Sequence, residues 1–147
     1  MTIELRDANT QDKDDCIALL GELRSATGSA DVATQGGCYE SLLDRARGQI
    51  IVAEEAGSIL GMATVSYNLA LRYGGEYCQL EELIVTPTAR RRNLGGLLVE
   101  RVLKNARSRG CAEIGLYLLE TTEHNRPFYE KYGFQVLGKE MRLKFES

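Results

Sequence analysis

The strongest structural signal in this chain is a strand–turn–helix pattern over residues 83–98. An apolar run, Leu-Ile-Val, leads through Thr-Pro-Thr-Ala into three arginines, then Asn-Leu-Gly-Gly, and then an amphipathic segment. The apolar run is typical of a strand buried on both faces, and the later segment has the period of a helix that covers a sheet. The pattern therefore favours an α/β fold with a loop and a helix start at the end of a buried strand.

The start of this helix predicts a phosphate site. Backbone N–H groups in a first helical turn lack intrahelical acceptors, and the helix dipole favours an anion there. Arg90, Arg91 and Arg92 can add charge-assisted hydrogen bonds, and Gly95 and Gly96 let the backbone come close to a ligand. Neither Gly-x-x-x-x-Gly-Lys-Ser/Thr nor Gly-x-Gly-x-x-Gly with a later ribose-binding acid is present. The alternative is that arginines and an Asn cap simply begin a surface helix.

Length and charge narrow the class of protein. A chain of 147 residues fits one domain, 1–147, and its net charge of −3 argues against general affinity for nucleic acid or acidic membranes. The four cysteines are widely spaced without a C-x-x-C pair, which favours buried thiols over a disulfide framework or a zinc site, and no metal is expected. Without a signal peptide or a membrane-length apolar run, we expect a cytoplasmic protein.

Hydrophobic periodicity predicts strands and helices in the order β-α-α-β-β-β-α-β-α-β. This order argues for a mixed α/β sheet with helices on both faces. Residues 25–37 carry no clear pattern. The predicted strands cover 3–6, 49–54, 59–67, 76–85, 112–119 and 134–145, and the predicted helices cover 12–24, 39–47, 93–109 and 123–132.

The strand–turn–helix stretch resembles the pyrophosphate loop of the GNAT superfamily of N-acetyltransferases. That loop reads Arg/Gln-x-x-Gly-x-Gly/Ala after a strand ending Leu-x-Val-x-Pro. In this chain the match is Arg90-x-x-Asn93-x-Gly95 after residues 83–87, Leu-Ile-Val-Thr-Pro. Asn93 stands where the family usually has glycine. Because Asn tolerates positive φ better than other non-glycine residues, we expect the loop to keep its shape.

A second segment carries the same resemblance. Residues 125–134, Asn-Arg-Pro-Phe-Tyr-Glu-Lys-Tyr-Gly-Phe, resemble the family's Asn-x-x-Phe-Tyr-Glu-Lys-x-Gly-Phe. The resemblance covers nearly the whole chain and is weakest over residues 25–48. Among family members, the chain is similar to small-amine enzymes such as aminoalkylphosphonate and polyamine acetyltransferases. It implies a mixed, mostly antiparallel sheet of six to seven strands flanked by about four helices on both faces. It also implies that the fourth and fifth strands splay apart for the cofactor.

The resemblance further implies acetyl-CoA as co-substrate. Its diphosphate would bind at 90–96, and its pantetheine arm would run between strands 76–85 and 112–119 and pair with main-chain groups. Asn125 matches a family residue that hydrogen-bonds the pantetheine region, although it could equally be a helix cap. The expected cofactor-binding residues are Ile84, Val85, Arg90, Arg91, Arg92, Asn93, Leu94, Gly95, Gly96, Asn125 and Tyr129.

Three residues are candidates for catalysis. Tyr129 matches the tyrosine that protonates the departing sulfur in many family members, and a phenol with a pKa of about 10 stays protonated at neutral pH; it could instead only pack beneath its helix. Glu81 matches the glutamate that relays a proton from the amine in polyamine-acetylating relatives, and Glu82 is the alternative acid. Strand alternation predicts that the two glutamates point to opposite faces, so that at most one enters the cleft. Either could instead be solvated or salt-bridged.

We therefore expect an N-acetyltransferase that moves an acetyl group to a primary amine of a small molecule by direct attack in a ternary complex. The alternatives are a protein or peptide N-acetyltransferase and a catalytically silent acyl-CoA-binding regulatory module. The identity of the acceptor and the length of the acyl group stay open at this point. The exposed edge of the last predicted strand is compatible with a homodimer.

Overall fold

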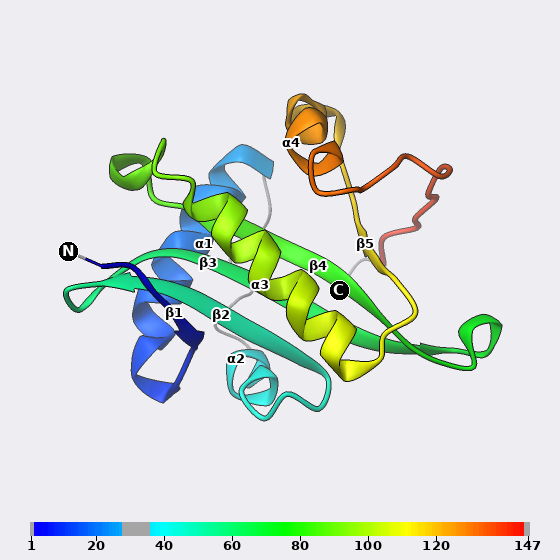
Figure 1. Cartoon of the computed structure of the whole chain (residues 1–147), viewed down its shortest axis with the longest axis horizontal. Coiled ribbons are helices and arrows are strands. Elements are labelled where there is room, and N and C mark those ends of the chain that lie inside the picture. The colour runs from blue at the N-terminus through cyan, green and yellow to red at the C-terminus, as the bar shows by residue number, and fades with distance from the viewer. Residues whose placement is uncertain (1, 28–35, 146–147) are drawn as a thin grey trace.

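The computed structural model of the protein describes residues 2–27 and 36–145. Within these residues the strands form one mixed sheet, in which β1 to β4 are antiparallel neighbours and β5 runs parallel to β4 (Figure 1). No helix in this part of the chain combines the length and the hydropathy that a membrane crossing requires. In spatial order the strands are β1 (Glu4–Asp7), β2 (Gly48–Glu55), β3 (Ser58–Ala70), β4 (Gly75–Val85) and β5 (Ile114–Leu116).

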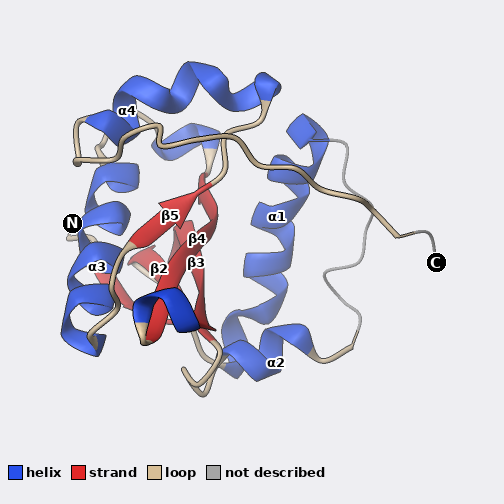
Figure 2. Ribbon diagram, turned by 90° about the vertical axis from the view of Figure 1, so that its right-hand side faces the viewer, coloured by secondary structure: helices blue, strands red, loops and turns tan. Residues whose placement is uncertain are grey.

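In the described part of the chain, four α-helices flank the sheet, as the family resemblance implied. They are α1 (Lys13–Thr27), α2 (Cys38–Leu42), α3 (Leu94–Arg109) and α4 (Arg126–Glu130). The sheet lies between α3 on one face and α1 with α2 on the other (Figure 2). A short 3-10 segment, Glu120–Asn125, links β5 to α4. The predicted fold class, with helices on both faces of a mixed and mostly antiparallel sheet, is confirmed.

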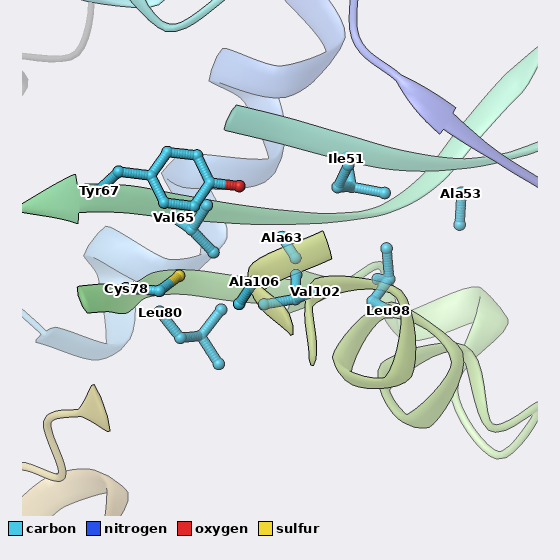
Figure 3. Packing of buried hydrophobic residues seen from close by; sticks show 10 residues of the cluster. All are labelled: Ile51, Ala53, Ala63, Val65, Tyr67, Cys78, Leu80, Leu98, Val102 and Ala106. Carbon is cyan, nitrogen blue, oxygen red and sulfur yellow. The ribbon is translucent and has the colours of Figure 1, made fainter. Parts of the chain in front are cut away.

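Two hydrophobic clusters join the helices to the sheet. On the α3 face, Leu98, Val102 and Ala106 follow the i, i+4 spacing and pack on inward residues of β2, β3 and β4 (Figure 3). On the other face, Cys16 and Leu19 of α1 contact the opposite side chains of the same strands. The sheet is therefore covered on both sides, which explains the continuous apolar run at the end of β4.

The pairing of β4 with β5 is short and positions the candidate site. Only residues 78–80 of β4 pair with 114–116 of β5, and β4 then continues to Val85 beside β3 alone. A β-bulge lies where this pairing stops, because Val65 faces Leu80 whereas Thr64 faces Glu82. The predicted parting of the fourth and fifth strands is thus present, next to an irregularity that sequence alternation did not predict.

Two expectations about the ends of elements were wrong. The helix predicted over 39–47 ends at Leu42, and Arg45 takes a positive φ of 67°. Gly48 is the first residue of β2 and does not end a helix. A Cβ at this position would lie 2.4 Å from the Val65 carbonyl oxygen, which explains why the residue is glycine. Part of the patternless stretch 25–37 continues α1 to Thr27, and part lies outside the described residues.

The predicted final strand is also wrong. Residues 134–145 form no strand in the structure, and the strand predicted over 112–119 shortens to three residues. The described sheet therefore has five strands instead of six or seven. The segment 134–145 leaves several large apolar side chains in solvent, among them Met141 and Phe145, which are 94% and 90% exposed. An alternating pattern alone therefore does not make this segment a strand, because a strand also needs an edge to pair with.

Candidate functional site

A pocket of about 360 Å³ opens at the end of β4, where the chain turns into α3. It lies between the loop after β4, the first turn of α3 and the aromatic ring of Phe128 in α4. The pocket is lined by Val85, Ala89, Arg90, Arg91, Asn93, Leu94, Gly95, Gly96 and Phe128. Two segments that sequence motifs singled out separately, 83–98 and 125–134, therefore meet around one cavity.

The first turn of α3 presents uncapped N–H groups to this pocket. Asn93 is the N-cap residue and takes a left-handed conformation with φ of 61°, as predicted for a residue that replaces glycine. Its side chain makes no capping hydrogen bond, and the first intrahelical bond runs from the Leu97 N–H to the Asn93 carbonyl oxygen. The N–H groups of residues 94–96 thus lack intrahelical acceptors at the positive end of a 16-residue helix.

The two glycines of this turn differ in what they permit. A Cβ at Gly96 would lie 2.2 Å from the Tyr132 hydroxyl and 2.4 Å from the Asn93 side-chain oxygen, so a larger residue would have to displace these two side chains. A Cβ at Gly95 would meet the Phe128 ring at 3.5 Å, which is an ordinary contact. Gly96 is therefore closely packed against side chains of the protein, whereas Gly95 could accept a Cβ without displacing its neighbours.

The three consecutive arginines do not act alike. Arg90 and Arg91 line the pocket, and Arg91 takes a left-handed conformation with φ of 72°. Arg92 does not line the pocket. Its guanidinium forms a bidentate ion pair with Glu55 at the end of β2. We call Arg90, Arg91 and the N–H groups of residues 94–96 the cradle. Its charge and free donors suit the diphosphate of coenzyme A.

Ile84 and Val85 lie where β4 has lost β5. Ile84 faces the α1 side of the sheet, and Val85 packs on the α3 side and lines the pocket. Within the described chain, the β4 edge that faces β5 is without a strand partner over 81–85. This edge can hydrogen-bond an extended ligand in the manner of an added strand, as the resemblance implied for the pantetheine arm.

Tyr129 and Asn125 come from the segment that contains α4. Tyr129 packs on the cluster beneath α3, in edge-to-face contact with Phe128 and Phe134 at centroid distances of 5.1 and 5.8 Å. Burial raises the pKa of its phenol, and its hydroxyl donates to no other described residue. Asn125 is exposed at the start of α4, and its side chain makes no capping hydrogen bond. Both side chains thus keep their polar groups available.

Glu81 and Glu82 lie on the same face of the sheet, which corrects the alternation argument. Ser66 donates to Glu81 at 2.6 Å, Thr64 donates to Glu82, and both donors lie on the α1 side of β3. The bulge at Glu81 inserts one extra residue in β4, so the side-chain direction shifts by one position between Leu80 and Glu82. Both carboxylates can therefore enter one site, beside the point where β4 and β5 part.

The two carboxylates differ in environment. Glu81 is exposed, whereas Glu82 is half-buried. Burial raises the pKa of Glu82 and the negative charge of Glu81 raises it further, while the hydrogen bond from Thr64 lowers it. A carboxylate with a raised pKa is better matched to accept a proton near neutral pH. Glu82 is thus the stronger candidate for a base, although the family resemblance favoured Glu81.

Several contacts around the site had no signal in the sequence. The hydroxyl donors Ser66 and Thr64 and the arginine partner Glu55 all come from β2 and β3, far along the chain from the residues they hold. Tyr132, whose hydroxyl approaches Gly96, belongs to the 125–134 motif, but its position shows only in the folded chain. Contacts between residues this far apart in the chain can be identified only when the pairing of the strands is known.

Comparison with known proteins identifies the family. The family model described as Acetyltransferase (GNAT) family matches residues 19–134. The chain is 29% identical to a glucosamine 6-phosphate N-acetyltransferase from Trypanosoma brucei brucei, over 96% of this chain and 95% of that protein. It aligns with the crystal structure of glucosamine-6-phosphate N-acetyltransferase from Arabidopsis thaliana with a TM-score of 0.81 and 28% identity, over 99% of this chain and 100% of that one.

A more distant structure shares the fold alone. An aminoglycoside N-acetyltransferase in complex with CoA aligns with a TM-score of 0.82 at 19% identity, over 99% of this chain and 96% of that one. The family match spans most of the sequence and contains the complete loop 90–96 and the segment 125–134. The chain therefore belongs to the acetyltransferase (GNAT) family and is an acetyl-CoA-dependent N-acetyltransferase.

Proposed function

We propose that this N-acetyltransferase acetylates the primary amine of a small molecule, and that the molecule is an amino sugar phosphate such as glucosamine 6-phosphate. The observation that carries the proposal is the bulge at Glu81, which directs two carboxylates to one face of the sheet. Carboxylates can hold an ammonium group and remove its proton. The similarity to a glucosamine 6-phosphate N-acetyltransferase along almost the full length of both chains supports the same acceptor class.

The proposed reaction uses residues from both faces of the sheet. Glu82 accepts a proton from the ammonium group, directly or through water, because only the neutral amine has a lone pair with which to attack. The freed nitrogen attacks the thioester carbonyl carbon, so that a C–N bond forms and the C–S bond breaks. Tyr129 donates its phenolic proton to the departing sulfur, and the second proton that the nitrogen loses as the amide forms returns to the Tyr129 oxygen through water. The cradle supports this chemistry by fixing the diphosphate, which aims the thioester between β4 and β5.

Arg142 is proposed to recognise the phosphate of the acceptor. Its guanidinium lies over the ring of Tyr117, 4.6 Å from the centroid, and pairs with Glu140. The hydrogen bond with Glu140 raises the pKa of this guanidinium, and the negative charge of Glu81 on β4 makes a smaller contribution in the same direction. A cation beside an ammonium-binding carboxylate suits an acceptor that carries both an amine and a phosphate.

Substitution of Arg142 should test the acceptor class. We expect Arg142→Gln to raise KM for glucosamine 6-phosphate about tenfold, because one charge-assisted hydrogen bond is lost. KM for glucosamine should change little, since that amine has no phosphate. Thiol release from acetyl-CoA measures both, and Lys144→Gln is the matched control, as it removes a positive charge from the same segment.

Turnover measured with several different amines also distinguishes the alternative functions. Wild-type protein should turn over glucosamine 6-phosphate faster than glucosamine, polyamines or peptides. Equal rates with and without the phosphate would contradict the sugar-phosphate proposal. A preference for a peptide N-terminus or lysine would favour a protein acetyltransferase, and no turnover of any amine would favour a silent acyl-CoA-binding module.

We also propose that the protein is a homodimer. Met141, Leu143 and Phe145 are 94%, 80% and 90% exposed and alternate with Arg142 and Lys144, as on a strand with one apolar face. Residues 135–145 form no backbone hydrogen bond with another described residue, and β5 is an edge strand. A second copy that covers this stripe would satisfy both, since large exposed apolar patches mark interfaces.

Light scattering after size-exclusion chromatography should give twice the 16.3 kDa mass of one chain. Met141→Lys together with Leu143→Lys should shift the protein toward one chain mass, because the apolar stripe becomes charged. Lys144→Gln, on the polar side of the stripe, should keep the double mass. A single-chain mass for the wild-type protein at micromolar concentration would refute the dimer.

The cellular setting is proposed on chemical grounds. Cys16 and Cys78 are buried free thiols, which suits a reducing compartment such as the cytoplasm. The net charge of −3 supports a protein that has no nucleic-acid or membrane partner.

A further inference from the structure

An ion pair between Glu55 and Arg92 joins the loop of residues 90–93 to the end of β2. Arg92 Nη1 donates to Glu55 Oε1 at 3.0 Å, and Nη2 donates to Glu55 Oε2 at 2.5 Å. The Glu55 side chain is 15% exposed and that of Arg92 is 42% exposed. Two parallel hydrogen bonds fix both the distance and the plane of the guanidinium, which a single contact would not do.

Both partners adjoin residues in left-handed conformations. Arg91 and Asn93, on either side of Arg92, have φ of 72° and 61°. Glu55 precedes Ala56 and Gly57, with φ of 51° and 85°, in the turn between β2 and β3. Non-glycine residues adopt this conformation at a cost, and it persists where surrounding contacts hold it. The ion pair joins two such turns.

Arg92 is held away from the pocket that its neighbours line. Arg90 and Arg91 face the pocket, whereas the Arg92 side chain extends to the β2–β3 turn. A third guanidinium beside the pocket would increase the attraction for a diphosphate. The position of the Arg92 side chain away from the pocket is therefore not explained by phosphate binding. The contact between Arg92 and a turn of the central sheet provides one, because it anchors the middle of the cradle loop.

We propose that Glu55 is a positioning residue for acetyl-CoA: by holding Arg92, it keeps residues 90–93 in the conformation that assembles the cradle before the cofactor arrives. This inference rests on the proposed diphosphate site. A loop that is already ordered loses less conformational entropy on binding, so the cofactor binds more tightly. Glu55 itself never touches the cofactor in this account; it acts through Arg92.

The sign of the effect of Glu55→Gln tests the proposal. On charge alone, removing a carboxylate near an anion site should tighten coenzyme A binding, and a released Arg92 should tighten it further. Positioning predicts the opposite, a Kd for coenzyme A raised about fivefold in calorimetry, because the loop must be ordered on binding. The value of kcat at saturating acetyl-CoA and KM for the acceptor amine should not change.

Three further variants complete the experiment. Glu100→Gln removes the same charge from the exposed side of α3 and should leave Kd unchanged. Arg92→Gln should weaken binding as much as Glu55→Gln does, and the double variant should be no weaker than either single one, because both break the same link. Amide hydrogen exchange over residues 90–96 of the free protein should be faster in Glu55→Gln than in Glu100→Gln.

Two outcomes would overturn different parts of the account. Coenzyme A binding by Glu55→Gln that is equal to or tighter than that of the wild-type protein would refute the positioning role. Arg90→Ala together with Arg91→Ala tests the cradle itself and should weaken binding whatever Glu55 does. If that double variant bound normally, the diphosphate site would be misplaced; if it bound weakly while Glu55→Gln bound normally, only the positioning role would fail.

Discussion

Tyr129→Phe should lower kcat about 100-fold at neutral pH, because general acid assistance to the departing sulfur is lost. Phe keeps the ring and therefore the edge-to-face contacts to Phe128 and Phe134. The affinity for coenzyme A should change little, since the cradle is untouched. Burial raises the pKa of the Tyr129 phenol, so the wild-type hydroxyl stays protonated and can donate throughout the neutral range.

Thiol release at saturating acetyl-CoA and calorimetry with coenzyme A separate the two effects. Tyr73→Phe is the matched control, because this tyrosine lies in the turn between β3 and β4 against Tyr77 and Arg72, away from α4. It should keep the wild-type kcat. A Tyr129→Phe enzyme with full kcat would remove this hydroxyl from the mechanism and leave residue 129 with a packing role alone.

Glu82→Gln should have the second large effect, a loss of about 100-fold in kcat near neutral pH, because the proposed base is gone. Glu81→Gln should act mainly on KM for the amine, since Glu81 is exposed and hydrogen-bonded to Ser66. The pH profile distinguishes them. The wild-type rate should fall at acid pH as Glu82 becomes protonated, and Glu82→Gln should abolish this limb while Glu81→Gln retains it.

Although Glu82→Gln should lower kcat, it should increase the stability of the folded protein at neutral pH. Burial raises the pKa of Glu82 in the folded state above its unfolded value, so the folded state binds more protons between the two values. The contribution of this group to stability is therefore present below the unfolded pKa and is lost as pH rises through the folded pKa. Thermal unfolding at neutral pH should show Glu82→Gln to be more stable than wild type. A less stable variant, or unchanged pH dependence of the rate, would contradict a buried base.

The parts of this account that were predictable from sequence depend on local patterns. The end of β4, the left-handed Asn93 and the start of α3 form one continuous stretch, so the strand–loop–helix geometry could be predicted without a structure. Motif spacing likewise singled out Tyr129. These features are set by residues close together in the chain, where hydrophobic period and turn chemistry act directly.

The parts that failed depend on distant residues. Alternation along Leu-Glu-Glu-Leu gives no indication of the bulge at Glu81, which exists because β3 pairs out of step with β4 there. The ion pair of Arg92 with Glu55 could not be predicted, because Glu55 lies 37 positions from Arg92. The segment 134–145 has the alternation of a strand, yet a strand also needs an edge to pair with, and that requirement is not written in its own residues.

A crystal structure of the protein with coenzyme A would show directly whether the cofactor binds as proposed. We expect the diphosphate to lie on the cradle, the pantetheine arm to pass between β4 and β5, and the sulfur to lie within hydrogen-bond distance of the Tyr129 hydroxyl. A nucleotide bound elsewhere, or a Tyr129 hydroxyl directed away from the sulfur, would contradict it.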